Sequence, residues 1–262
     1  TTPFGMLGFL EEVKRRLEDT GVRGLFLVLD EINGITAEPA FAHFVKGLVD
    51  SNALSREPLP LLLMLCGVQE RRREMIQAHQ PVERIFDVVD LGPLADGEMV
   101  EFFRRAFDSA QIEVQPGAMD SLTHWSAGFP KIMHVVGDNA YWVDRDGVID
   151  ALDAVEAVTR AADEVGRKYV DEQVYRALRS DAYRSLLAKI GKLDPGAMSF
   201  RRADIAPSLT DEERRKLTSF LQRMKDLQVL RAGDVAGEYV FTLRMARLYI
   251  WLASIRKERH RD

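Results

Sequence analysis

The stretch Gly24-Leu25-Phe26-Leu27-Val28-Leu29-Asp30-Glu31 is the part of this 262-residue sequence from which the rest can be arranged. Its apolar run is bounded by a glycine on one side and two acids on the other. A run this short and this rich in Leu, Val and Phe predicts a fully buried strand rather than a helix. Such strands belong to parallel sheets covered on both faces, and ligands bind at their carboxyl ends. Asp30 and Glu31 are therefore placed to meet a bound ion or phosphate, unless the strand simply ends in a polar turn.

The composition is that of an ordinary globular protein, with 46% hydrophobic and 29% charged residues. Cys66 is the single cysteine, which excludes a disulfide framework and predicts a reducing, cytoplasmic compartment. No apolar stretch approaches the roughly 20 residues of a membrane-spanning helix, and the N-terminus lacks the pattern of a secretory leader. We therefore expect no membrane association. The first residue is Thr1 rather than Met, which indicates a fragment or a trimmed chain.

Charge is divided unevenly along the chain. The overall balance is −5, but residues 166–262 carry a net charge of +8 and residues 1–165 carry −13. An asymmetry of this kind predicts an acidic module joined to a basic module that has a different partner.

The first third of the sequence alternates between helical and strand patterns. Apolar residues at helical spacing occur in residues 6–20 and 39–49, and residues 70–79 predict a charged helix with Arg71, Arg72 and Arg73 in a row. Short apolar runs that predict strands occur in residues 25–29, 61–65 and 88–91. This alternation predicts an α/β fold with a partial doubly wound parallel sheet. Gly92-Pro93-Leu94 ends the alternation, so we place a first domain at residues 1–92.

The next segment, residues 93–166, is predicted to form an all-α domain. The expected helices cover residues 97–110 with Asp96 as the N-cap, residues 117–125, a segment that follows Gly128-Phe129-Pro130-Lys131 and runs through Val143, and residues 149–165. We interpret this domain as a small helical lid behind the sheet domain.

Residues 167–262 have the element order of a winged-helix domain. The expected elements are a long helix over residues 170–190, a short helical or extended piece at 200–206, a helix from the capping box Thr210-Asp211-Glu212-Glu213 to about residue 227, strands at 229–231 and 238–242, and a final helix over 244–257. The order helix, helix, helix, β-ribbon is typical of a winged helix-turn-helix.

With these pieces in order, the chain resembles the AAA+ ATPases, P-loop enzymes of which one branch joins an ATPase core and a helical lid to a C-terminal winged helix. Origin-recognition initiator ATPases, archaeal-type ATPases and STAND switches share this plan. The likeness covers nearly the whole chain. Residues 26–31 match the Walker B element, Leu61 to Leu65 look like the sensor 1 strand, and Gly128-Phe129-Pro130-Lys131 is similar to the sensor 2 element.

The resemblance implies a site for ATP and Mg²⁺. Asp30 would hold Mg²⁺ through water, and Glu31 would position the attacking water. Arg84 stands where such families often keep an arginine finger, and Lys131 stands where they have a basic residue facing the γ-phosphate. The chemistry suits these residue types, because phosphoryl transfer depends mainly on charge placed around the γ-phosphate. Mg²⁺ prefers hard oxygen ligands, and a guanidinium is permanently charged.

Three features depart from the family pattern. The sequence contains no G-x-x-x-x-G-K-[ST] loop, the backbone of which normally cradles the phosphates, so this loop either lies upstream of Thr1 or has been lost. Cys66-Gly67 stands where sensor 1 normally has a polar residue. Arg84 also suits a surface salt bridge and has rivals in Arg71, Arg72 and Arg73, which in turn suit a solvated helix face.

The basic C-terminal module supports a second hypothesis, the binding of duplex DNA. A winged helix places its recognition helix in the major groove and its wing against the DNA backbone. The candidate recognition helix carries Arg214, Arg215, Lys216, Arg223 and Lys225. The basic residues expected to contact DNA are Arg201, Arg202, Arg214, Arg215, Lys216 and Arg231. The alternatives are that these charges only solubilise helices or that the module packs against the ATPase core. The acids at 211–213 oppose entry of the helix into a groove lined by phosphates.

Two functions therefore follow from the sequence. In the first, the protein is an AAA+ type ATPase that acts as a nucleotide-dependent switch or DNA-associated motor, with self-association or a protein partner. In the second, it is a scaffold that binds DNA or protein through the winged helix and does not hydrolyse ATP. The histidines show no metal-ligand spacing with one another or with Cys66.

Overall fold

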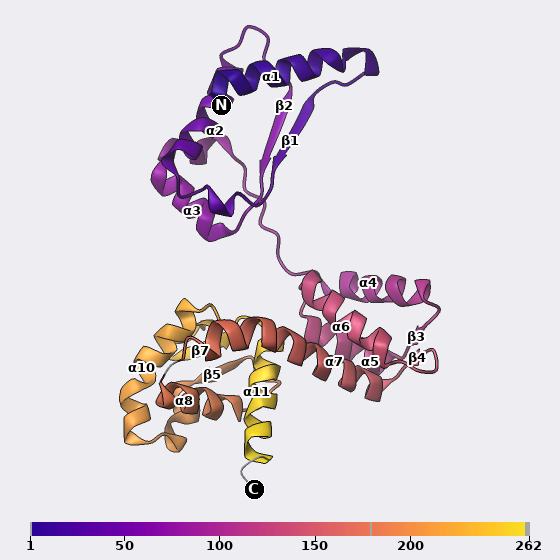
Figure 1. The fold of residues 1–262 in the computed structure, drawn as a ribbon, viewed down its shortest axis with the longest axis vertical. Helices are drawn as coiled ribbons and strands as arrows, with labels where there is room; N and C mark the ends of the chain where they lie inside the picture. Colours follow the sequence, from indigo (N-terminus) through magenta and orange to yellow (C-terminus); the bar gives the residue numbers. More distant parts are fainter. Residues whose placement is uncertain (1, 179, 260–262) are drawn as a thin grey trace. The chain divides into compact units, whose positions relative to one another are not determined.

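The computed structural model of the chain describes residues 2–178 and 180–259. The chain divides into two compact units, residues 1–90 and residues 91–262 (Figure 1), and each is described by itself. The predicted boundaries after residues 92 and 166 stay predictions. In the described ranges, no helix combines the length and the apolarity that a membrane crossing requires.

The first unit contains two parallel strands and the helices between them. Its elements are α1 (Pro3–Arg16), the 3₁₀ turn η1 (Glu18–Thr20), β1 (Leu25–Leu29), η2 (Ile32–Gly34), α2 (Pro39–Ala53), β2 (Leu61–Leu65), α3 (Gln69–Ala78) and η3 (Gln80–Ile85). β1 and β2 pair from Leu25 opposite Leu61 to Leu29 opposite Leu65. Both strands were predicted from their apolar runs, and both predictions are confirmed.

One face of this sheet is covered and the other is open. Leu25, Leu27 and Leu61 pack with residues of α1 and α2, and Leu63 and Leu65 of β2 pack with residues of α2 and α3. The ribbon in Figure 1 has these helices on one side of the two strands. The alternate side chains are exposed: Phe26 58%, Val28 44%, Leu62 61% and Met64 44%. The prediction of a strand buried on both faces is therefore wrong for these residues, because helices of this unit cover only one face.

The third strand predicted for the sheet is also absent from the described residues. Residues 86–95 form neither helix nor strand, and Val89 and Leu91 are exposed. Their β-branched and apolar character favours a strand, but a strand needs a hydrogen-bonded neighbour. The described sheet has the two strands β1 and β2 and is not doubly wound.

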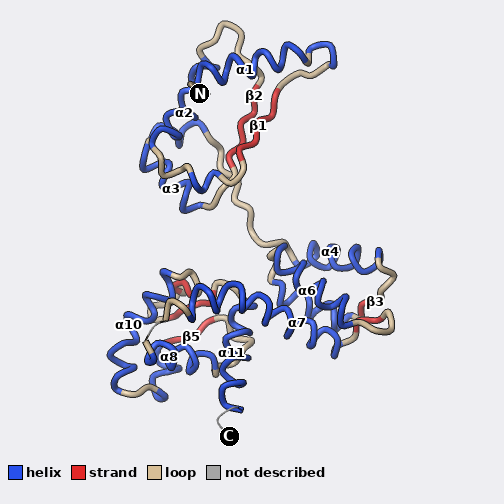
Figure 2. The backbone as a smooth tube through the Cα atoms, in the orientation of Figure 1, coloured by secondary structure: helices blue, strands red, loops and turns tan. Residues whose placement is uncertain are grey.

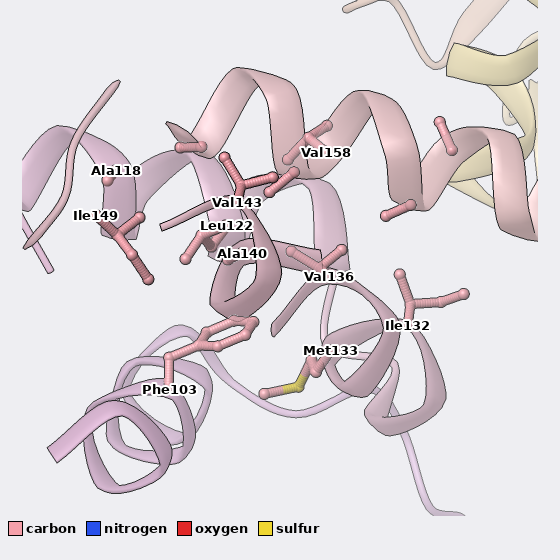
Figure 3. Packing of buried hydrophobic residues seen from close by; sticks show 14 of the residues in the cluster. Phe103, Ala118, Leu122, Ile132, Met133, Val136, Ala140, Val143, Ile149 and Val158 are labelled. Atoms are coloured by element: carbon pink, nitrogen blue, oxygen red, sulfur yellow. The ribbon is translucent and has the colours of Figure 1, made fainter. Parts of the chain in front are cut away.

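The second unit begins with a helical bundle. Its elements are α4 (Asp96–Ser109), β3 (Glu113–Val114), α5 (Pro116–Ser126), α6 (Pro130–Val143), β4 (Val148–Ile149) and α7 (Ala151–Val165), with β3 and β4 forming a small parallel pair. Phe103, Leu122 and Val136 are fully buried in its core (Figure 3). The four predicted helices are confirmed, but Ala95 rather than Asp96 occupies the N-cap of α4, and the Glu98 side chain accepts from the Ala95 N–H.

The remainder of the second unit carries an antiparallel sheet (Figure 2). Its elements are the π-helical segment η4 (Gly166–Tyr175), α8 (Asp181–Gly191), β5 (Ser199–Arg201), α9 (Arg202–Ile205), η5 (Ala206–Ser208), α10 (Asp211–Asp226), β6 (Leu230–Ala232), β7 (Glu238–Phe241) and α11 (Arg244–Arg259). The strand order is β5-β7-β6. The single helix predicted for residues 170–190 is wrong, because η4 and α8 are separate and α8 begins after Ser180.

α11 joins the two hydrophobic clusters of the second unit. Met245 and Leu248 belong to the cluster of the bundle, whereas Tyr249 and Ile250 belong to the cluster around α8 and α10. Gly166 permits this junction, because a Cβ added there would lie 2.1 Å from Cγ of Tyr249. The Tyr249 hydroxyl donates to Asp171, and burial together with this hydrogen bond raises the pKa of the tyrosine.

Candidate functional site

Asp30 and Glu31 lie at the carboxyl end of β1, as the sequence predicts. Both side chains are exposed to solvent. Asp30 Oδ1 accepts a hydrogen bond of 2.8 Å from the Glu31 N–H. Glu31 has a left-handed backbone, with φ 51°, which is uncommon for a residue other than glycine and turns the chain sharply from the strand into η2. The two acids therefore stand side by side at the sheet edge where ligands bind in parallel sheets.

A set of contacts fixes this turn to the end of the neighbouring strand. The Ile32 N–H donates to the Cys66 carbonyl at 3.2 Å, and Asn33 Oδ1 accepts from the Val68 N–H at 3.0 Å. Gly67 allows the approach, since a Cβ added there would lie 3.0 Å from Ile32 and 3.1 Å from Asn33 Oδ1. The acids are thus carried on a turn held by both strands rather than on a free loop.

Asn33 is a residue of this edge that the sequence interpretation missed. Its partner lies 35 positions away, and no local pattern marks such a contact. Cys66-Gly67 lacks the polar side chain that sensor 1 normally has. The Asn33 side-chain amide, from the turn after β1, lies at this strand end instead. A signal was present only in the residue type, because an Asn two residues after a pair of strand-end acids suits a side chain that bonds to backbone groups.

Arg84 and its three rivals are all in the first unit. Arg84 lies in the last turn of η3, is exposed and makes no ion pair in the described part of the chain. Arg71 pairs with Glu74 at 2.7 Å, and Arg72 pairs with Glu83 at 3.6 Å. These ion pairs indicate that Arg71 and Arg72 belong to a solvated helix face. The finger role of Arg84 stays a prediction.

Lys131 lies in the first turn of α6, after the tight turn made by Gly128. Gly128 has φ +76°, and a Cβ added there would lie 2.4 Å from the Leu94 carbonyl oxygen, so its role is to let residues 93–94 pack against this turn. The exposed Lys131 places its Nζ 5.1 Å from the centre of the Tyr169 ring. Lys131 and Asp30 belong to different units, and their meeting across a nucleotide stays a prediction.

The residues of the first unit fit the metal part of a magnesium nucleotide. Only one oxygen of Asp30 is engaged by the backbone, so the other oxygen and the Glu31 carboxylate are accessible hard ligands of the kind that Mg²⁺ and its waters prefer. This sequence lacks the glycine-rich loop that would bind the phosphates of the nucleotide. Among the described residues, no group of three or more His, Cys, Asp or Glu side chains could hold a metal ion.

The predicted DNA-contacting residues all lie on exposed parts of the second unit. Arg201 ends β5, Arg214 and Arg215 lie on the outer face of α10, and Arg231 lies on β6. Neither Arg214 nor Arg215 makes an ion pair in the described residues, whereas Lys216 pairs with Glu212 at 2.7 Å. The structure therefore leaves two adjacent guanidinium groups on α10 free for a ligand.

Arg202 is held between the sheet and α10. Its Nη2 donates to the Tyr239 hydroxyl at 2.9 Å, its guanidinium lies 5.7 Å from the centre of that ring, and its Nη1 is 3.5 Å from the Thr218 hydroxyl. Held in this way, an arginine loses less conformational freedom when it binds an anion.

Glu213 belongs to the fold rather than to a ligand surface. The side chain is 4% exposed, caps α10 by accepting from the Thr210 N–H at 2.7 Å, and receives hydrogen bonds from Ser185 and Lys189 of α8. Burial alone would raise the pKa of this carboxyl, but the hydrogen bonds from Lys189, Ser185 and Thr210 lower it to about 2. One of the three acids expected to repel DNA is therefore turned inward.

Arg247 is a second buried charge that the sequence interpretation missed. It is 1% exposed and donates to the carbonyls of Gly191, Leu193 and Asp194, which follow one another where α8 ends. Burial lowers its pKa to about 10, with partial compensation from Asp194. Arg247 therefore closes the end of α8 and is unavailable to a ligand.

Comparison with known proteins gives a fold and no family. No protein-family model and no curated protein matches the chain. Among solved structures, the chain is similar to the Walker-type ATPase PABY2304 of Pyrococcus abyssi, with a TM-score of 0.50 and 18% identity over 91% of this chain and 67% of that chain. This likeness shows a fold similar to that of a P-loop ATPase, and at this identity it shows the fold alone.

Proposed function

We propose that the protein is a nucleotide-dependent ATPase of the Walker type. The observation that carries the proposal is the pair of exposed acids, Asp30 and Glu31, on a braced turn at the carboxyl edge of a parallel sheet. The fold similar to that of a Walker-type ATPase supports it. The finer assignment, to the AAA+ branch with a helical lid and a winged helix, rests on the order of elements along the chain.

In this proposal each acid has a separate task. Asp30 would hold Mg²⁺ through water with the oxygen that the backbone leaves free, and Glu31 would orient the nucleophilic water and accept its proton. Bound Mg²⁺ would neutralise charge on the phosphates. Arg84 is the candidate finger toward a nucleotide of a neighbouring copy, and Lys131 is the candidate lid residue. The bracing by Asn33 and Gly67 would keep Glu31 in place, which matters because catalytic groups act only when correctly oriented.

The open face of the first unit supports a sheet that is completed from outside these residues. Parallel sheets are normally covered on both faces, yet Phe26, Val28, Leu62 and Met64 are exposed. The unpaired segment 86–91 is apolar and has no neighbouring strand. We propose that sequence upstream of Thr1 supplies the phosphate-binding loop together with the strand and helix that cover this face.

Nucleotide titration tests the ATPase proposal directly. Full-length protein, together with any sequence upstream of Thr1, is expected to bind MgATP at micromolar concentration. The 262-residue chain alone is expected to bind at least about 100-fold more weakly, because backbone N–H groups that cradle the phosphates supply much of the affinity. Calorimetric titration with and without Mg²⁺ measures both values. Absence of binding by full-length protein at millimolar ATP would leave the scaffold as the surviving hypothesis.

A second function, binding of duplex DNA by the C-terminal part, is favoured by the free outer face of α10. The order α8, β5, α9, α10, β6, β7 agrees with a winged helix, in which α10 would be the recognition helix and the turn between β6 and β7 the wing. Arg214 and Arg215 have no ion-pair partner among the described residues, and Glu213 is buried away from the surface. Cations that are free of partners suit phosphate oxygens.

Charge reversal tests this second function. Replacement of Arg214 and Arg215 by Glu is expected to lower duplex affinity at least about 50-fold at 100 mM salt and to flatten the dependence of affinity on salt, because fewer counterions are released. Fluorescence anisotropy over a salt series measures both. The control is the change of Arg104 and Arg105 to Glu; these are two adjacent exposed arginines of α4, which pair with Glu101. Unchanged circular dichroism of both variants is required for the comparison. Equal losses of duplex affinity in both variants would indicate only a general charge effect and would contradict the assignment of DNA binding to α10.

A further inference from the structure

A groove lies along one side of α10, between this helix and the start of α8. Its volume is about 710 Å³. Ala177, Ser180 and Tyr183 line it at the start of α8, and the polar side chains that line it from successive turns of α10 are Lys216, Ser219, Gln222, Arg223 and Asp226. The lining therefore combines charged and hydroxyl groups with apolar surface.

The groove is lined by cations and hydroxyl groups that have capacity to bind a ligand. Arg223 is exposed and makes no ion pair in the described residues, and Lys216 pairs only with the exposed Glu212 of its own helix. Ser180 does not use its side chain to cap α8, and the Ser219 hydroxyl has no hydrogen-bond partner among the described residues. The one acid, Asp226, already accepts from Gln222 at 2.8 Å. Arg, Lys and Ser are among the side chains that bind phosphate oxygens.

Cations also lie on the opposite flank of α10. At 100° per residue, Arg214 and Thr218 lie on the side away from Lys216 and Arg223, and Thr218 is the residue that Arg202 reaches from the sheet side. Arg215 and Gln222 lie on the ridge between the two flanks. An α-helix fits the major groove of B-DNA, which has phosphates of one strand along each side. The exposed side between the flanks also carries Asp211 and Asp226. Cations on both flanks nevertheless match the two phosphate strands better than they match a single acidic peptide.

We infer that the groove between α8 and α10 binds the phosphates of one strand of duplex DNA, with Arg223 and Lys216 as the cations and Ser180 and Ser219 as the neutral donors. The flank formed by Arg202 and Arg214 meets the other strand, and the ridge of Arg215 and Gln222 faces the bases. This inference rests on the proposed DNA-binding function; it adds Ser180 and Ser219 to the site and assigns Arg223 to a groove beside one strand.

Neutralisation of the groove cations tests the inference. The test uses the 262-residue chain and a 20-base-pair duplex, with anisotropy measured between 50 and 300 mM salt. Arg223→Gln is expected to weaken binding about 5- to 10-fold at 100 mM salt and to lower the slope of log K against log salt by about 1. The double variant with Arg223→Gln and Lys216→Gln is expected to lower this slope by about 2. Arg145→Gln is the matched control and is expected to change neither, because Arg145 is an exposed arginine of the bundle that makes no ion pair in the described residues. Ser180→Asp, which places a carboxylate in the groove, is expected to weaken binding at least as much as Arg223→Gln.

The outcomes separate the inference from the function on which it rests. If wild-type chain binds duplex and Arg223→Gln binds equally well while the Arg214 and Arg215 reversal abolishes binding, the groove is not a strand site although the DNA function stands. If wild-type chain binds no duplex at 50 mM salt, both fail. If a polyglutamate peptide binds in a manner that requires Arg223 and duplex does not bind, the groove serves an acidic protein and the inference is overturned. Unchanged circular dichroism of the variants confirms that each remains folded.

Discussion

Replacement of Glu31 by Gln is expected to lower ATP turnover of the full-length protein by about 100-fold or more while ATP affinity changes less than about 3-fold. Gln has nearly the same shape and fits the left-handed backbone as well as Glu does, but its amide cannot accept a proton from water. The exposed position of Glu31 means that the change removes no buried contact. Steady-state phosphate release and calorimetric ATP titration measure the two quantities on the same preparation.

Two controls make this result specific. Glu38→Gln changes an exposed acid at the start of α2, away from the strand end, and is expected to leave turnover unchanged. Asn33→Ala removes the hydrogen bond to Val68 that braces the turn, and is expected to lower turnover with a smaller effect than Glu31→Gln. Full turnover in Glu31→Gln would refute the role of this acid, and equal losses in Glu31→Gln and Glu38→Gln would indicate a general effect of charge.

Replacement of Glu213 by Ala is expected to destabilise the second unit by about 3 kcal/mol, because it removes one partner of a buried ion pair. Ser185 would lose its acceptor, and Lys189 would keep only the Ser208 carbonyl. Glu212→Ala is the matched control. Glu212 is the preceding residue, is exposed and pairs only with Lys216, so its loss is expected to cost less than about 1 kcal/mol. Urea unfolding followed by circular dichroism measures both values, and similar losses would show that Glu213 is not the capping acid that the geometry indicates.

The pH dependence of stability gives an independent readout of Glu213. Its pKa is about 2 in the folded chain, against 4.5 for an ordinary Glu, so the folded state favours the ionised form. The stability from Glu213 is fully present above about pH 4.5 and is lost as pH falls toward 2, by about 3 kcal/mol for a difference of this size. The stability gap between wild type and Glu213→Gln should therefore narrow over this range. A gap that stays constant down to pH 2.5 would contradict the assignment.

The elements of the fold were predictable where local sequence decides them. β1 and β2 follow from short apolar runs, and α10 begins at Thr210 as its capping box predicts. Elements that need distant partners were not predictable from the local sequence. The run at residues 88–91 has the composition of a strand, but a strand forms only beside another strand. The division of the helix predicted for residues 170–190 likewise depends on packing of α8 against α10 and α11.

In the candidate sites, the residue types were predictable from the sequence, but the contacts between distant residues were not. Asp30 and Glu31 were found because strand-end acids are visible in sequence. The contact of Asn33 with Val68, the burial of Glu213 and the groove beside Arg223 were not visible, because each joins residues separated by many positions. Glu213 even had the opposite interpretation, as an acid that repels DNA, since sequence alone does not show on which face of α10 it lies.

The junction formed by α11 has a mechanical consequence. One helix closes both hydrophobic clusters of the second unit, and the fit of Tyr249 against Gly166 leaves no room for sliding at that point. We therefore expect the bundle and the three-stranded sheet to move together at α11, so that a displacement of the bundle is passed on to the cluster that contains Leu217 and Phe220 of α10.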